Sequence, residues 1–125
     1  MIWTAILPSG NALYPNDSVV SDNGRYHLNL QGDGNLVLYD VVVSPWKVLW
    51  ASNTAGQAVS RCIMQTDGNF VLYGYPGGKP GVLFATNTAN HPNASLYVQD
   101  DGNTVIYQPH APIWASNEYF INLGY

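Results

Sequence analysis

Charged residues are scarce in this chain. Only 10% of its 125 residues are Asp, Glu, Lys or Arg, and the four Lys and Arg residues do not cluster. With a formal net charge of -4, the chain lacks the basic surface that nucleic acids and anionic lipids attract. We therefore expect neither class of partner, and a surface formed largely by neutral polar groups and tyrosines.

Cysteine and long apolar runs are also nearly absent. Cys62 is the single cysteine, so no disulfide can form within the chain. No run approaches the ~20 apolar residues that a membrane-spanning helix needs. Residues 1–8 lack a basic start followed by a long apolar stretch. We expect no membrane insertion, and a chain that is cytoplasmic or released without a classical signal peptide, or secreted if it is a processed form.

What the sequence does contain is an internal repeat. The pattern Gln-x-Asp-Gly-Asn-x-Val-x-Tyr, called the motif below, occurs at residues 31–39, 65–73 and 99–107, in steps of 34 residues. Each copy is followed by a large aromatic residue, then Ala, then Ser or Thr, then Asn; the aromatics are Trp50, Phe84 and Trp114. Such spacing indicates one supersecondary unit used three times.

The repeat unit is typical of antiparallel strands. Apolar and polar residues alternate, Asp-Gly and Asn-Gly pairs mark turns, and no stretch has helical spacing. One small sheet is not stable alone, so we expect three sheets that pack together in an all-β fold with pseudo-threefold symmetry. The expected organisation is one domain over residues 1–125, with repeats at approximately 20–53, 54–87 and 88–117.

The motif is predicted to double back at its Asp-Gly tip. A straight strand would hold Gln31 and Tyr39 roughly 26 Å apart, at ~3.3 Å per residue, which exceeds the length of a monosaccharide. A three-residue loop at 32–34 makes Gln31 face Asn35 and leaves an apolar set on the opposite face. That inward set is Leu28, Leu30, Leu36 and Leu38, then Cys62, Met64, Phe70 and Leu72, then Leu96, Val98, Thr104 and Ile106.

The other face of each hairpin carries the candidate site. Turn formation accounts for Asp and Gly, but it does not account for the same Gln and Tyr in all three copies. A carboxylate, two amides and a phenol supply the donors and acceptors that bind neutral hydroxyls. The candidate binding residues are Gln31, Asp33, Asn35, Val37 and Tyr39; Gln65, Asp67, Asn69, Val71 and Tyr73; and Gln99, Asp101, Asn103, Val105 and Tyr107.

The tripled motif and the aromatic-Ala-Ser-Asn that follows it resemble the bulb-type (snowdrop-like, monocot) mannose-binding lectins, over about residues 7–117. The resemblance implies a β-prism II fold of three antiparallel four-stranded sheets, with Trp50, Phe84 and Trp114 near the centre. It implies binding of α-D-mannose and of high-mannose glycans or glycoproteins, for recognition or defence, with no metal or other cofactor. By position it assigns the sugar's axial 2-hydroxyl to Asp and Asn, its 3-hydroxyl to Gln, its 4-hydroxyl to Tyr and its ring carbons to Val.

The chain departs from this family at its disulfide and at its ends. Plant members usually carry a disulfide whose first partner is replaced here by Gly34, which leaves Cys62 alone and resembles non-plant or cytoplasmic-type members. The family often dimerises by exchanging C-terminal strands, and the apolar tail at 117–125 needs burial. We therefore expect a homodimer, formed by exchange of this tail, and an N-terminal segment 2–4 that completes a sheet beside it.

Two other functions are open to the same residues. A glycosidase needs two carboxylates that flank a bond. The one adjacent pair, Asp100 and Asp101, lies in a turn of a single repeat, so we expect no catalytic residue. The histidines lack ligand spacing and the loops lack a calcium pattern, so we expect no metal site. The alternative is a protein-interaction or antimicrobial toxin-like module on the same fold, with Trp46 as an exposed contact or as a lid over the hydrophobic edge.

Overall fold

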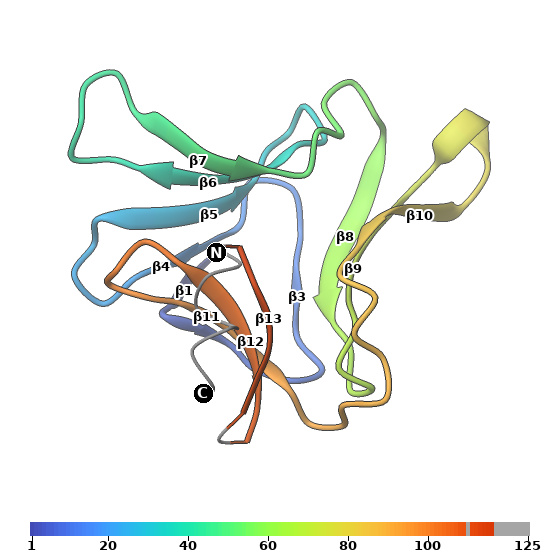
Figure 1. Cartoon of the computed structure of the whole chain (residues 1–125). Coiled ribbons are helices and arrows are strands. Elements are labelled where there is room, and N and C mark those ends of the chain that lie inside the picture. Colours follow the sequence, from blue (N-terminus) through green and yellow to red (C-terminus); the bar gives the residue numbers. More distant parts are fainter. Residues whose placement is uncertain (110, 117–125) are drawn as a thin grey trace.

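The computed structural model describes residues 1–109 and 111–116, and these form strands and turns with one short 3-10 segment, η1 (Pro76–Gly78). Figure 1 shows three sheets arranged around a common centre. The first sheet has the strand order β1-β4-β5-β6-β7, the second β10-β9-β8-β3 and the third β13-β12-β11-β2. The expected all-β fold of three sheets is confirmed.

Each sheet is built on one motif hairpin and the strand that follows it. The first consists of β5 (Tyr26–Leu30), β6 (Leu36–Asp40) and β7 (Lys47–Ala51), the second of β8 (Val59–Met64), β9 (Phe70–Gly74) and β10 (Gly81–Ala85), and the third of β11 (Ser95–Val98), β12 (Thr104–Gln108) and β13 (Ala111–Ala115). The register is the predicted one: His27 faces Tyr39 and Asn29 faces Val37. The first hairpin therefore turns through three residues, as expected.

The N-terminal segment supplies the remaining strand of every sheet. From it, β2 (Ile6–Leu7) joins the third sheet, β3 (Ala12–Leu13) the second, and β4 (Ser18–Val20) the first. The first sheet differs from the prediction of four antiparallel strands, because β1 (Ile2–Thr4) adds to β4 in parallel as a fifth. The expectation that residues 2–4 complete a sheet is confirmed, because β1 pairs with β4. The tail at 117–125, which was expected beside them, lies outside the described residues.

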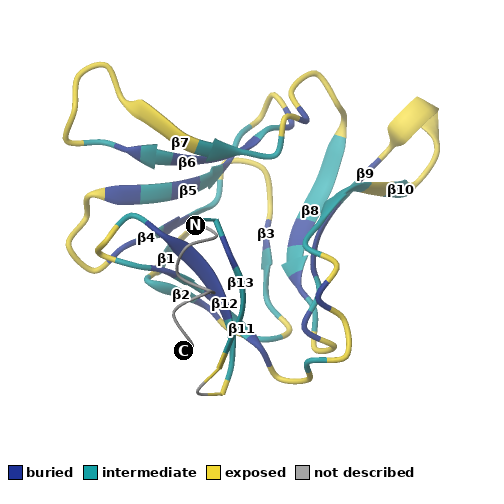
Figure 2. Ribbon diagram, viewed as in Figure 1, coloured by how far each residue is buried: buried dark blue, intermediate teal, exposed yellow. Residues whose placement is uncertain are grey.

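The core lies between the three sheets, on the side that the alternation predicted. All twelve inward positions are buried, from Leu28 in the first sheet to Ile106 in the third. Figure 2 shows buried stretches on strands of all three sheets. Trp50 meets both Phe84 and Trp114 edge-on, with ring centroids 5.2 and 5.9 Å apart. Such edge-to-face pairs are favourable aromatic geometry. The three aromatics therefore join the three sheets to one another, as the resemblance implied.

Cys62 is a core residue, and its thiol is expected to be unreactive in the folded chain. Its side chain is fully buried, and this burial raises the pKa of the thiol well above its ordinary value. Because the thiolate is the reactive form, DTNB should modify Cys62 at least roughly 100-fold more slowly in the native protein than in guanidinium chloride. Equal rates in the two solvents would place Cys62 at the surface.

Candidate functional site

The tip of each motif hairpin is fixed by its aspartate and its glycine. Asp33 Oδ1 accepts a hydrogen bond from the Asn35 backbone N–H at 2.9 Å, and the same bond recurs at the second and third tips. Gly34 has φ +95°, a conformation that favours glycine, and the equivalent glycines have φ +93° and +89°. The exposed carboxylate thus has one oxygen engaged in a turn, which holds the group at the edge of the site.

Glutamine and tyrosine of each motif form a hydrogen-bonded pair on the outward face. The Tyr39 hydroxyl donates to Gln31 Oε1, while Gln65 Nε2 donates to the Tyr73 hydroxyl. In the third sheet Gln99 Nε2 donates to the Tyr107 hydroxyl at 2.6 Å. The loop reversal therefore brings together side chains that are eight positions apart in sequence. Because each pair is already formed, little side-chain freedom is left to lose when a ligand binds.

The motif asparagines are held by hydroxyl groups that the sequence analysis did not name as site residues. Ser52 Oγ donates to Asn35 Oδ1 at 3.2 Å, and Thr86 Oγ1 and Ser116 Oγ donate to the equivalent asparagine oxygens at 3.4 and 2.7 Å. These hydroxyls are the Ser or Thr that follow the large aromatic and Ala in each repeat. The signal was therefore present in the aromatic-Ala-Ser/Thr-Asn sequence that follows each motif, but only the fold places it behind the motif.

The motif valines are more deeply buried than an open apolar patch for sugar ring carbons would be. Val37, Val71 and Val105 lie on the outward face, yet they are only 1–2% exposed. They form the buried floor of each site and do not offer an open apolar patch. Their near-complete burial favours a packing role beneath the polar groups, so any contact with a ligand is confined to the little surface that remains.

A β-bulge lies opposite each motif tyrosine. The pairing of the third strand shifts between Leu38 and Tyr39 in the first sheet, and at the equivalent place in the other two. In each case one apolar residue before the large aromatic is the extra one: Leu49, Leu83 and Ile113. Bulges redirect the side chains beside them. The repeated bulge lets the aromatic turn to the centre while the tyrosine faces outward.

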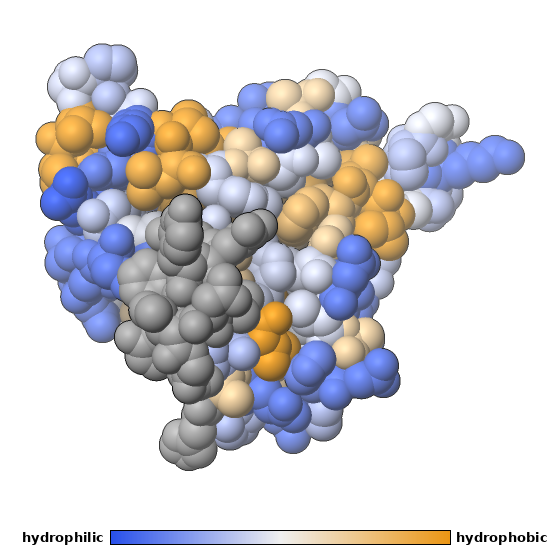
Figure 3. All heavy atoms as spheres, viewed as in Figure 1, coloured by the Kyte–Doolittle hydropathy of each residue, from blue (hydrophilic) through white to orange (hydrophobic). Residues whose placement is uncertain are grey.

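The three tyrosines have different neighbours. Trp46 meets Tyr39 edge-on at 5.6 Å, the Arg61 guanidinium carbon lies 5.4 Å from the Tyr73 ring centre, and Tyr97 meets Tyr107 edge-on at 5.2 Å. Trp46 is 52% exposed, and Val42 and Val48 of the same β6–β7 hairpin are also exposed. Apolar side chains gather at this end of the molecule, at the upper left of Figure 3. Trp46 therefore flanks the first site and is not closed over by the sheet.

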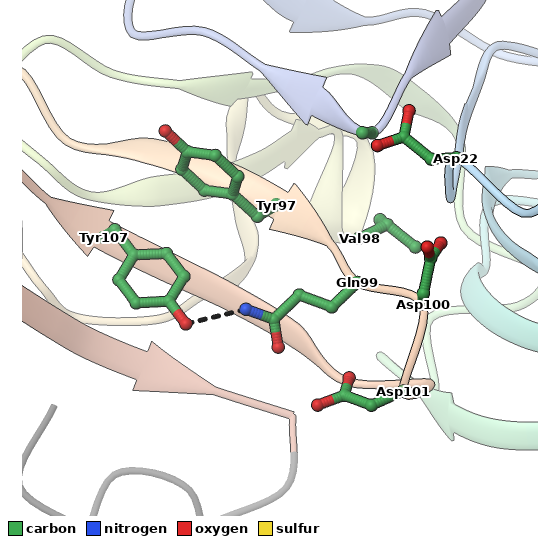
Figure 4. A pocket seen from close by; sticks show the side chains of 8 residues that line it. Asp22, Tyr97, Val98, Gln99, Asp100, Asp101 and Tyr107 are labelled. Carbon is green, nitrogen blue, oxygen red and sulfur yellow. Dashed lines mark hydrogen bonds between the residues drawn. The ribbon is translucent and has the colours of Figure 1, made fainter.

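The third site opens into a pocket of about 410 Å³ (Figure 4). Gln99 and Tyr107 point toward each other on one side, and Asp101 lies at the hairpin tip. The neighbouring Asp100 accepts a hydrogen bond from the Asn23 backbone N–H at 2.9 Å, which ties the tip to the first sheet. Asn103 is nearly buried, whereas Asn35 and Asn69 are half-buried. The three sites thus share one plan and differ in their surroundings.

Cations are nearly absent from the motif faces. Arg25 is bound to Asp40 at 2.9 Å, and its guanidinium lowers the pKa of that carboxyl by hydrogen bonding.

Within the described ranges, no three His, Cys, Asp or Glu side chains gather as a metal site. No helix in that part of the chain is long and apolar enough to cross a membrane. The carboxylate, amide and phenol groups of each motif are those that can form hydrogen bonds with neutral hydroxyls.

Solved structures that resemble this chain include mannose-binding lectins. A monomeric monocot mannose-binding lectin from Gastrodia elata has a TM-score of 0.76 and 38% identity, over 90% of this chain and 96% of that one. The mannose-specific agglutinin of snowdrop (Galanthus nivalis) bulbs, complexed with methyl-α-D-mannoside, has a TM-score of 0.66 and 40% identity, over 82% and 88% of the two chains. The chain belongs to the bulb-type mannose-binding lectins.

Members that are similar to this bulb-type lectin differ in assembly. A lectin from Mycobacterium smegmatis, described as a domain-swapped dimer, has a TM-score of 0.51 and 43% identity, over 87% of this chain and 95% of that one. The Gastrodia lectins are described as monomeric. No known family profile matches the chain. The lectin spans between 7% and 48% of the length of the curated relatives that it matches.

Proposed function

We propose that this chain is a single-domain lectin that binds α-D-mannose and mannose-containing glycans or glycoproteins at three sites, without metal or other cofactor. The observation that carries the proposal is the Gln–Tyr pair beside an Asp-Gly tip in every sheet. The mannoside bound to the snowdrop agglutinin supports the choice of sugar. The proposed sites are Gln31, Asp33, Asn35, Val37 and Tyr39; Gln65, Asp67, Asn69, Val71 and Tyr73; and Gln99, Asp101, Asn103, Val105 and Tyr107.

The chemistry of the sites suits a neutral sugar. Each motif sets a carboxylate, two amides and a phenol around one hairpin, so that vicinal hydroxyls can both donate and accept. Asp and Asn are proposed for the axial 2-hydroxyl, Gln for the 3-hydroxyl and Tyr for the 4-hydroxyl. Each hydrogen bond exchanged against water is worth only ~0.5–1.5 kcal/mol net, so a single site is expected to bind at about 1 mM. Three sites turn this weak binding into avidity on a mannose-covered surface.

We propose no enzymatic activity. Glycoside hydrolysis needs a pair of carboxylates on either side of a bond. Of the adjacent pair, Asp100 is engaged with the Asn23 backbone and Asp101 with the Asn103 backbone. Both carboxylates thus have a role in the turn. Incubation with mannan oligosaccharides should release no sugar.

We propose a homodimer formed by exchange of the C-terminal tail. Residues 117–125, which would be exchanged, lie outside the described residues, and the proposal is supported by their apolar composition and by the domain-swapped relative. Sedimentation velocity on the full chain should give the mass of two copies. A single copy at every concentration would favour the arrangement described for the Gastrodia lectins.

The whole proposal is tested on immobilised mannose. The chain should be retained and should be eluted by methyl α-mannoside but not by methyl α-galactoside, because the galactoside lacks the axial 2-hydroxyl. Retention should be unchanged in EDTA. A chain that passes through the column unretained would favour the protein-interaction module instead.

Removal of one tyrosine hydroxyl tests whether the sites are independent. Tyr107→Phe leaves Gln99 Nε2 without its 2.6 Å partner and removes one group for the sugar. Its site should bind methyl α-mannoside about 3- to 10-fold more weakly, with the other two unchanged, as followed by NMR titration. Tyr97→Phe is the control, because it removes a nearby hydroxyl that is outside the motif. Loss of all binding in Tyr107→Phe would contradict independent sites.

A further inference from the structure

The second site has a positive charge where the others have none. Arg61 faces Tyr73 across the β8–β9 pair, and its guanidinium carbon lies 5.4 Å from the ring centre of that tyrosine. The equivalent positions in the first and third sheets are His27 and Ser95. Among the described residues, no cation lies over Tyr39 or Tyr107. Arg61 therefore distinguishes the second site from its two copies.

Arg61 has no acidic partner in the part of the chain that the structure describes. The ion pairs there join Asp17 to the terminal amine and Asp40 to Arg25. The side chain is half-buried, and its guanidinium forms no hydrogen bond with a described residue. A guanidinium carries five donors that suit oxyanions. In a chain with a net charge of -4, an unneutralised arginine beside a binding tyrosine is available to a ligand.

A separate cavity of about 210 Å³ surrounds this charge. Arg61, Tyr73, Tyr75 and Pro80 are among the residues that line it, and no carboxylate lines it. Beside the hairpin tip lies another cavity, called the motif cavity below, which Gln65 and Asp67 line together with Gly10, Ile63 and Thr66. The hydrogen bond from Gln65 to Tyr73 links the walls of the two cavities. A ligand that fills the motif cavity can therefore continue past Tyr73 toward Arg61.

We infer that this second cavity binds an oxyanion carried by the sugar next to the bound mannose, such as a carboxylate or a phosphate. Gln65 follows Arg61 by four positions, so their α-carbons lie roughly 13 Å apart along a strand at about 3.3 Å per residue. Because the cavity lined by Arg61 is separate from the cavity beside the hairpin tip, we place the charge opposite the neighbouring sugar. The cation lies beside Tyr73 in a cavity that no carboxylate lines, so no neighbouring carboxylate there would repel an anion. The inference rests on the proposed mannose site and names its preferred ligand.

The experiment isolates the second site. Asp33→Asn with Asp101→Asn weakens the first and third sites and leaves the second as the main one. Three probes are titrated by calorimetry at low salt: α-linked mannobiose, the same disaccharide with a phosphate monoester on one residue, and mannose linked to mannuronic acid. Both charged probes should bind about tenfold tighter than mannobiose, and the gain should shrink as salt is added. A gain for one charged probe alone would identify which oxyanion the cavity accepts.

Substitution of the arginine decides whether Arg61 is responsible. Arg61→Gln in this background should remove the gain, and Arg61→Lys should keep part of it, because lysine retains the charge without the planar fork. Lys79→Gln is the matched control, since Lys79 is an exposed cation that does not line the cavity. Equal affinity for charged and neutral probes, or a gain that survives Arg61→Gln, would overturn the inference. Failure to bind even neutral mannobiose would instead contradict the proposed function.

Discussion

Replacement of the three motif aspartates by asparagine, in Asp33→Asn, Asp67→Asn and Asp101→Asn together, is expected to abolish retention on immobilised mannose while the fold is kept. Each aspartate uses Oδ1 to accept the backbone N–H two residues on, at 2.9 Å in all three tips. An asparagine oxygen can accept the same bond, so the turn survives. What is lost is the charge that strengthens a hydrogen bond to a sugar hydroxyl.

The expected loss is about 10- to 100-fold at each site, because hydrogen bonds to charged groups contribute about 1.5–3 kcal/mol. Avidity multiplies these losses, so the triple variant should elute with the column void, whereas each single variant should still be retained. Surface plasmon resonance on a mannosylated surface measures the change.

Asp100→Asn provides the matched control for this experiment. Asp100 is an exposed carboxylate next to Asp101, but it bonds to the Asn23 backbone and not within the motif. Its variant should bind mannose as the unmodified chain does. If the triple variant were retained like the unmodified chain, with an unchanged circular dichroism spectrum, the carboxylates would not be ligands for the sugar.

The alternation of the motif hairpins was enough to predict their register and their buried face. A one-residue slip exchanges the faces of a strand, and only one register left an apolar face in all three copies. This is why Cys62 and Thr104 could be assigned to the core by position, although neither residue type requires it. The same register brought Gln and Tyr to one face, which the structure joins by a hydrogen bond.

The strands β2 and β3 of the N-terminal segment could not be predicted, because each is two residues long and has no period to read. Their pairing is decided by distant partners in β11 and β8. The neighbours of the tyrosines were missed for a related reason. Trp46 comes from a connecting loop and is placed by a tertiary contact that the repeat does not encode, whereas Arg61 holds the register position opposite Tyr73 and only the placement of its side chain over the ring comes from the structure.

Gly68→Ala is expected to destabilise the protein by about 3 kcal/mol or more and to disable the second site. Gly68 has φ +93°, and an added Cβ would lie 2.4 Å from the His91 carbonyl oxygen and 2.9 Å from that of Thr88. Both are backbone atoms of the segment that leads to the third sheet. His91 is itself bonded to the tip, through its N–H to the Asp67 carbonyl at 2.9 Å. The clash can be relieved only if this segment moves away from the loop that carries Asp67.

Gly56→Ala is the matched control, because it measures the cost of a left-handed backbone without a close contact to the added Cβ. Gly56 has φ +85°, but nothing lies within 4 Å of the Cβ it would gain. Its variant should therefore lose only the ~1 kcal/mol that a left-handed alanine costs. Thermal unfolding should place Gly68→Ala roughly 10 °C below the unmodified chain and Gly56→Ala within a few degrees of it. Similar melting temperatures for the two variants would mean that the segment at 88–91 does not press on the second motif, and that the site does not depend on it.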